Sequence, residues 1–159
     1  MSSFVANPRT PAPTSTPEKT VTNDGFFPDI EPADVRAAAR ITSTVTADRL
    51  RAAILGAVMA AEEDLRAWSA DRRREGFATL AAVPAPELDG KSVQVVRYHR
   101  AIELLTKAEV VERYRDLDTT GAGDRKADVM DPSAAELRAD ATAAIRSILG
   151  RTKTTVELI

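Results

Sequence analysis

The sequence TADRLRAAILGAVMAAEEDLRAWSADRRREG, residues 46–76, carries the strongest structural signal in this chain. Its apolar side chains recur at steps of three and four residues, which places them on one face of an α-helix. Thr46 is a favourable N-cap, Asp48 lies near the positive end of the helix dipole, and Gly76 is a typical C-cap residue. The apolar stripe consists of Leu50, Ile54, Ala57, Val58, Ala61, Leu65 and Trp68. We predict a helix of about 30 residues, roughly 45 Å long, with this stripe buried.

A shorter helix is predicted before this long helix and a second long helix after it. Pro32 suits a first helical turn, and residues 33–40 favour helix. Pro84 and Pro86 interrupt the chain, and the Asp-Gly pair at 89–90 predicts a turn. The second long helix is expected from about Lys91 to Asp116, with apolar residues on more than one face. The predicted ion pairs between successive turns are Glu62–Arg66, Glu103–Lys107 and Glu109–Arg113.

The last helix is predicted from its caps. Asp131 is expected as the N-cap with Pro132 at the first helical position, and Gly150 is expected to end the helix. The apolar stripe of this helix consists of Leu137, Ala141, Ala144, Ile145 and Ile148. The predicted fold class is therefore all-α, a helical bundle with two long and two shorter helices.

The two ends of the chain differ in composition from the helical part. Residues 1–22 hold four of the nine prolines and many threonines. A segment of this composition buries too little apolar surface to offset the entropy of ordering, so we expect an extended arm or a dispensable leader. Residues 151–159 are rich in β-prone side chains, so we expect a strand-like tail or a frayed end. The predicted organisation is an arm (1–22), a helical domain (23–150) and an extended tail (151–159).

Composition excludes several classes of site. The chain has 159 residues, about one domain, and 43% hydrophobic residues, enough for one core. It has no cysteine and one histidine, so disulfide frameworks, thiol nucleophiles and multi-histidine metal centres are excluded. The net charge of −2 argues against a clamp that holds DNA by bulk positive charge. Because these classes of site are excluded, we predict a non-enzymatic protein without cofactors. No signal peptide or membrane span is expected, so we predict that the protein is made in the cytoplasm.

Several short motifs favour structural interpretations. His99 has no nucleophile or orienting partner at motif spacing, so we interpret it as a packed or surface residue. Gly121 and Gly123 lack the preceding strand of a dinucleotide fingerprint and predict a flexible joint. Asp124, Asp128 and Asp131 lack the alternating pattern of a calcium loop, which leaves capping and solvation.

Two features of the first long helix suggest contacts. The run Arg72-Arg73-Arg74 is expected to be a solvated helix end beside the C-terminal dipole, with contact to an acidic partner or a phosphate as the alternative. It wraps most of a turn, so it is not a single-faced DNA reader. Trp68 closes the apolar stripe and is interpreted as a core or interface anchor.

Motifs along most of the chain resemble those of a known family. The first lie between residues 27 and 51, the next between 113 and 127, and the last between 145 and 159. They read Phe27-Pro28-Asp29-Ile30, Pro32-Ala33-Asp34 with Arg36, Thr44-Val45-Thr46, Arg49-Leu50-Arg51, Arg113-Tyr114-Arg115-Asp116, Asp118-Thr119-Thr120, Gly123-Asp124-Arg125-Lys126-Ala127, Ile145-Arg146-Ser147-Ile148-Leu149-Gly150-Arg151 and Thr154-Thr155-Val156-Glu157-Leu158-Ile159. Together these motifs resemble the head completion (GpL) family of tailed phages.

The resemblance implies a structural protein of the virion neck, at the head–tail junction, assembled in the bacterial cytoplasm. It implies a homo-oligomeric ring beneath the portal that stabilises the DNA-filled head and provides the platform for tail attachment. The implied partners are the portal protein, other copies of the chain and the next neck or tail-completion component, while packaged DNA only passes through the channel. No membrane is involved.

We expect partner contacts in two segments. The first is rich in alternating charges and holds Tyr114, Arg115, Asp116, Asp118, Asp124, Arg125 and Lys126. The second is the tail, with Thr154, Thr155, Val156, Glu157, Leu158 and Ile159, which is suited to adding a strand to another chain's sheet. The alternative functions are a DNA-binding packaging subunit resembling the small terminase, with Arg72–Arg74 as its only basic run, and a small helical enzyme, for which no nucleophile–base pair is evident.

Overall fold

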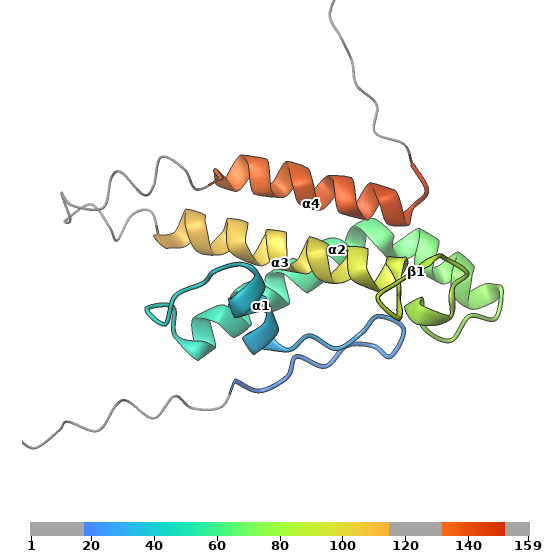
Figure 1. Ribbon diagram of the computed structural model, residues 1–159, viewed down its shortest axis with the longest axis horizontal. Helices are drawn as coiled ribbons and strands as arrows, with labels where there is room; N and C mark the ends of the chain where they lie inside the picture. Colours follow the sequence, from blue (N-terminus) through green and yellow to red (C-terminus); the bar gives the residue numbers. More distant parts are fainter. Residues whose placement is uncertain (1–17, 115–131, 152–159) are drawn as a thin grey trace, which may run out of the picture.

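A computed structural model describes residues 18–114 and 132–151, and these form a helical bundle with one short hairpin (Figure 1). The long helices predicted from the sequence are α2 and α3, and the shorter ones are α1 and α4, so the helical fold class is confirmed. The two-stranded hairpin was not predicted. The elements are α1 (Pro32–Ala38), α2 (Ala47–Arg74), the 3-10 helix η1 (Leu80–Ala82), β1 (Glu87–Leu88), β2 (Lys91–Ser92), α3 (Val93–Tyr114) and α4 (Ala134–Ile148).

Helix α2 begins and ends where its sequence predicts. Thr46 is the N-cap, although its side chain makes no capping hydrogen bond. Gly76 has φ +97°, a left-handed conformation that glycine adopts without a Cβ clash. The N–H of Gly76 donates to Arg73 O at 3.0 Å and the N–H of Phe77 to Arg72 O at 3.1 Å, the two hydrogen bonds of a Schellman motif. Both ends of this helix therefore lie where the local sequence signals predict them.

Helix α3 is the central element of the bundle. It packs against α4 and α2, and α1 also contacts it (Figure 1). Tyr98, Ala101, Ile102 and Ala108 are all fully buried on it. Since neighbours lie on more than one side of α3, its apolar residues are spread around the helix, as predicted, instead of forming one stripe.

Helix α4 begins later than predicted. Its N-cap is Ser133, not Asp131, which lies outside the described residues. The Ser133 hydroxyl accepts from the backbone N–H of Glu136, and the Glu136 carboxylate accepts from the N–H of Ser133, so the two form a capping box. This reciprocal pair satisfies two N–H groups that the helix leaves unpaired, whereas an aspartate cap satisfies one. Pro132 therefore precedes the cap instead of occupying the first helical position.

The N-terminal strip, residues 18–31, lies across the bundle and completes the core. Val21 pairs with Ile30 through two backbone hydrogen bonds of 2.8 and 2.9 Å, and both side chains are buried. Phe26 and Phe27 are also buried and touch edge to face, with 5.1 Å between ring centroids. Residues 18–22, assigned to the arm from composition, thus pack on the helices, while residues 1–17 lie outside the described chain.

One of the three predicted ion pairs forms as expected and two do not. Glu109 pairs with Arg113 at 2.8 Å. Arg66 pairs with Glu63, and the Glu62 carboxylate instead accepts a hydrogen bond from the Tyr98 hydroxyl at 3.3 Å. No ion pair joins Glu103 to Lys107 in the described helices, and Lys107 Nζ donates to the Arg40 carbonyl at 3.4 Å. Glu62 and Lys107 thus make tertiary contacts in place of the weak intrahelical ion pairs that were predicted for them.

Candidate interaction surfaces

Most of the predicted interface residues lie outside the described parts of the chain. Tyr114 is the last residue of α3, and the next described residue is Pro132, which precedes α4. Arg151 is the last described residue before the tail. The residues outside are Arg115, Asp116, Asp118, Asp124, Arg125, Lys126, Thr154, Thr155, Val156, Glu157, Leu158 and Ile159. Their contacts therefore stay predictions.

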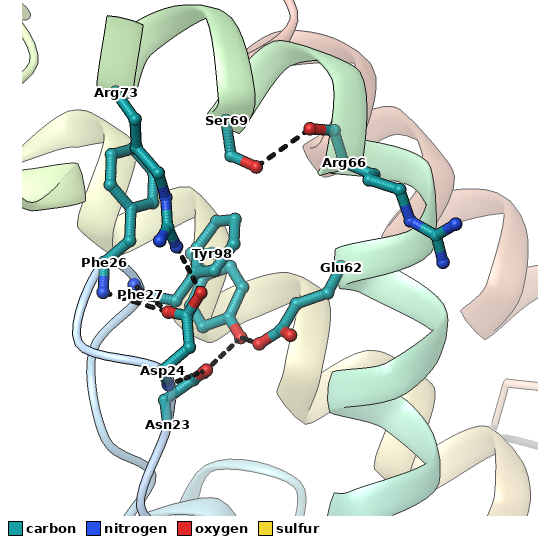
Figure 2. Close-up of polar contacts among 9 residues, drawn as sticks. All are labelled: Asn23, Asp24, Phe26, Phe27, Glu62, Arg66, Ser69, Arg73 and Tyr98. Carbon is teal, nitrogen blue, oxygen red and sulfur yellow. Dashed lines mark hydrogen bonds and ion pairs between the residues drawn. The ribbon is translucent and has the colours of Figure 1, made fainter.

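The most elaborate polar site in the described residues is the Tyr98 cluster, shown in Figure 2. It consists of Asn23, Asp24, Glu62, Arg73 and Tyr98. The fully buried Tyr98 ring stacks on Phe27 with 4.8 Å between centroids. Its hydroxyl accepts from Asn23 Nδ2 at 3.0 Å and donates to Glu62 Oε1 at 3.3 Å. The cluster thereby joins the N-terminal strip to both long helices.

Asp24 organises the turn that leads into the two phenylalanines. Its Oδ1 accepts from the backbone N–H of Phe26 at 2.9 Å and of Phe27 at 3.3 Å, and its other oxygen pairs with Arg73 (Figure 2). Burial raises the pKa of Asp24, but these hydrogen bonds and the Arg73 charge outweigh it, so the pKa lies below its ordinary value. Burial, together with the Glu62 charge, raises the pKa of Tyr98, which keeps that hydroxyl protonated.

We predict that Asp24→Asn makes the protein slightly less stable at pH 7 but not at acidic pH. A carboxyl with a lowered pKa in the folded state stabilises above its ordinary pKa, and this contribution is lost as the pH falls through the folded value. The amide oxygen still accepts from Phe26, so only the exposed ion pair with Arg73 is lost, about 0–1 kcal/mol. Urea unfolding at pH 7 and at about pH 3 measures the difference. Asp64→Asn, on the exposed surface of α2, is the matched control; an equal deficit for Asp24→Asn at both pH values would contradict the prediction.

Arg36 is a structural residue whose role the sequence analysis missed. From α1 it donates to the carbonyls of Thr42 at 2.7 Å and Val45 at 3.1 Å, and it pairs with Glu18 from the N-terminal strip. It thereby holds the loop between α1 and α2 against the strip. Arg36 belongs to the family motifs between residues 27 and 51, and these motifs are the only sign in the sequence that this residue is important.

The arginine run at the end of α2 is used within the chain. Arg72 pairs with Glu75 at 2.7 Å, Arg74 pairs with Asp71, and Arg73 pairs with Asp24. The Arg73 guanidinium also lies 4.8 Å from the centre of the Phe26 ring, and that of Arg72 lies 5.9 Å from the centre of Trp68. Trp68 packs against the core, as the anchor interpretation predicts. The run is therefore charge-compensated and does not present three free cations to a phosphate.

No convergent catalytic or metal-binding arrangement is found in the described residues. His99 is half-buried, and burial lowers its pKa, with Lys91 as a second cause, so the ring is neutral at physiological pH. Residues 18–114 and 132–151 contain no cluster of three metal-ligating side chains. None of the helices that the structure describes is long and apolar enough to span a membrane.

Apolar side chains are exposed at two places on the described surface. Leu55 and Met59 lie one turn apart on α2, with Met59 73% exposed. Leu88, in the hairpin, is 61% exposed. Single exposed apolar residues are ordinary, but a pair on one helix face is a suitable contact for a neighbouring protein.

Comparison with known proteins completes this description. The family model described as "Phage head completion protein (GPL)" matches residues 21–159. The chain belongs to this family. It is similar to the "Head completion/stabilization protein" of Escherichia phage P2, with 37% identity over 89% of this chain and 84% of the relative. It is also similar to the "Probable head completion/stabilization protein" of Haemophilus phage HP1 (strain HP1c1), with 22% identity over 87% of this chain and 91% of the relative. No solved structure matches.

Membership of the GPL family confirms the resemblance inferred from the motifs. The protein is a structural head completion protein and a component of the virion, and the DNA-binding alternative is not supported. Within the first motif region, Phe27, Ile30, Pro32 and Val45 are buried and Arg36 is bonded to the loop after α1. These motif residues therefore build the fold, while the motifs at 115–127 and 154–159 lie in the segments expected to meet partners.

Proposed function

We propose that this head completion protein forms a ring beneath the portal, where it stabilises the DNA-filled head and provides the platform for tail attachment. The observation that best supports a ring is where the described helices end before the two segments expected to bind partners. The end of α3 and the start of α4 lie at one end of the α3–α4 pair, and the end of α4 lies at the opposite end (Figure 1). A subunit with contact segments at opposite ends is suited to head-to-tail association, which closes into a ring.

Charge supports the same proposal. The net charge is −2, and the densest basic run is neutralised by carboxylates of its own chain. A ring with little free positive charge lets DNA pass without holding its phosphates. The exposed pair Leu55 and Met59 adds a small apolar contact for a neighbouring subunit.

We predict that the free protein is monomeric or weakly associated and forms a closed ring only on the portal. The buried apolar residues of all four helices pack within one chain, which leaves too little exposed apolar surface for a large permanent interface. Sedimentation of the purified protein, alone and with isolated portal, measures both states, and electron microscopy of the mixture shows the ring. A stable ring of the free protein at low concentration would contradict templated assembly, and no binding to portal would overturn the proposed function.

We predict that reversing Asp124 or Arg125 singly reduces ring formation without lowering the melting temperature. The alternating charges of this segment suit ion pairs across a subunit boundary, and both residues lie outside the described helical core. One exposed pair contributes only about 0–1 kcal/mol, so a large assembly defect requires repetition around the ring. Thermal unfolding and portal binding are compared for each variant. An equal loss of folding stability would mean that the pair is structural.

A further inference from the structure

A hollow lies between the end of α1, the middle of α3 and the start of α4. Its volume is about 310 Å³. Five of its lining residues are small or apolar and are called the floor, and four are charged and are called the rim. The lining residues are Ala38, Ala39, Arg40, Arg100, Glu103, Leu104, Lys107, Pro132 and Leu137.

The charge of this hollow is mainly positive. It is lined by three cations, Arg40, Arg100 and Lys107, and by one carboxyl group, Glu103. In the described chain neither Arg40 nor Arg100 has an ion-pair partner, and Lys107 Nζ has only a long contact of 3.4 Å to the Arg40 carbonyl. Burial raises the pKa of Glu103, although the neighbouring Arg100 charge acts to lower it, so one carboxyl group faces three cations. The hollow is therefore suited to an apolar segment that carries a carboxylate.

The end of the tail has this chemistry. In an extended chain, Val156 and Leu158 point to one side and Glu157 to the other. The two apolar side chains match the floor formed by Ala38, Leu104 and Leu137, and a carboxylate between them matches the cationic rim. The basic Lys153 lies three residues earlier, about 10 Å away in an extended chain, so it falls outside the hollow.

The described residues of another copy offer the tail no comparable site for strand addition. The sheet found in the described residues has two strands of two residues each, β1 and β2. Such short edges supply few free backbone groups for a segment of six or more residues. On a neighbouring copy, a hollow is therefore a better binding site for the tail than a sheet edge.

We propose that, in the ring, residues 156–159 of one copy lie in this hollow of the next copy. Val156 and Leu158 contact the apolar floor, and Glu157 accepts hydrogen bonds from the cationic rim. This docking rests on the proposed ring and specifies its lateral contact. It also agrees with the geometry of the subunit, because the tail leaves α4 at one end and the hollow includes the start of α4.

A neighbouring copy is a better source of the tail than the same chain. Leu137 lies about 20 Å along α4 from Gly150, given 1.5 Å per residue. Six fully extended residues, from 151 to 156, cover about 20 Å, so the chain's own tail would just reach the hollow with no slack. A tail from the next subunit is free of this restriction on length and can place all of residues 156–159 in the hollow.

Engineered disulfides test the docking, and the natural absence of cysteine makes the background clean. Full-length Leu104→Cys and Leu158→Cys variants are co-produced during phage growth, and the particles are oxidised mildly. We expect disulfide-linked dimers that contain one copy of each variant, since a disulfide needs Cα atoms within about 7 Å. Ala67→Cys, on the exposed surface of α2 and outside the Leu55–Met59 pair, replaces Leu104→Cys as the matched control and is expected to give none.

Two outcomes overturn the docking while the ring stands. One is a particle-bound ring without these dimers, or with equal dimers from the Ala67→Cys control. The other is a double variant, Leu104→Cys with Leu158→Cys in one chain, that closes only within itself. Wild-type protein that is absent from portal-containing particles would instead overturn the ring and the docking together.

Charge reversal provides an independent readout. When either Lys107→Glu or Glu157→Lys is added singly to the cysteine pair, the dimer yield is expected to fall at least about fivefold. This is the effect of losing one hydrogen bond to a charged group. Both reversals together, with Lys107→Glu on the acceptor copy, are expected to restore much of the yield. Arg66→Glu is the matched charge change on α2 and should leave the yield unchanged. Equal yields for all these variants would contradict the placement of Glu157 at the rim.

Discussion

Deletion of residues 152–159 is expected to abolish head completion while the helical domain keeps its stability. Within residues 18–114 and 132–151, every buried core residue lies between Val21 and Ile148, and α4 ends in hydrogen bonds from Gly150 and Arg151 to its last turn. The free energy of unfolding should therefore change by no more than about 0.5 kcal/mol. Since the tail is proposed to join neighbouring copies, its loss should reduce the yield of DNA-filled, tailed particles to background.

The control for this deletion is a tail of the same length and composition in scrambled order. It should fold equally well and fail equally in assembly, because the alternation of Val156, Glu157 and Leu158 is lost. Thermal unfolding, DNA retention in heads and tail joining are the three measurements. Particles that retain DNA and accept tails at normal yield with the deleted protein would show that the tail has no such role.

Replacement of Tyr98 by alanine is expected to cause the largest loss of folding stability among single core changes at the Tyr98 cluster. The ring is fully buried and stacked on Phe27, so its removal leaves a cavity and costs about 3–5 kcal/mol. A domain of this size is stable by only about 5–15 kcal/mol, so this loss removes a large part of its stability. The N-terminal strip should be released first, because Asn23 and Phe27 contact this side chain.

Urea unfolding separates the ring from its hydroxyl. Tyr98→Phe keeps the stacking and removes the hydrogen bonds with Asn23 and Glu62, so we expect a loss of about 1 kcal/mol. Met59→Ala, at a residue that is 73% exposed, should change the free energy of unfolding by less than about 0.5 kcal/mol. A loss below about 1 kcal/mol for Tyr98→Ala would contradict the view that this cluster fastens the strip to the long helices.

The segments expected to bind partners are the part of the candidate site that sequence motifs indicate most directly. The charged stretch after Tyr114 and the tail after Arg151 carry family motifs and lie outside the described residues. The hollow at α1, α3 and α4 was not predictable, because its residues come from three separate regions of the chain. Only tertiary packing brings Arg40, Lys107 and Leu137 around one space.

By itself, the sequence determined the elements whose signals are local. The spacing of apolar residues and the caps Thr46 and Gly76 define α2, and Gly150 ends α4, because helix propensity and capping act within one or two turns. The start of α4 is also local, because Ser133 and Glu136 form the capping box that the pattern Ser-x-x-Glu encodes, and this box, not Asp131, caps the helix. What the sequence did not reveal are contacts between distant segments. Glu62 binds Tyr98 and Arg73 binds Asp24 because packing brings these groups together across 36 and 49 residues, and such proximity leaves no periodic trace in the chain.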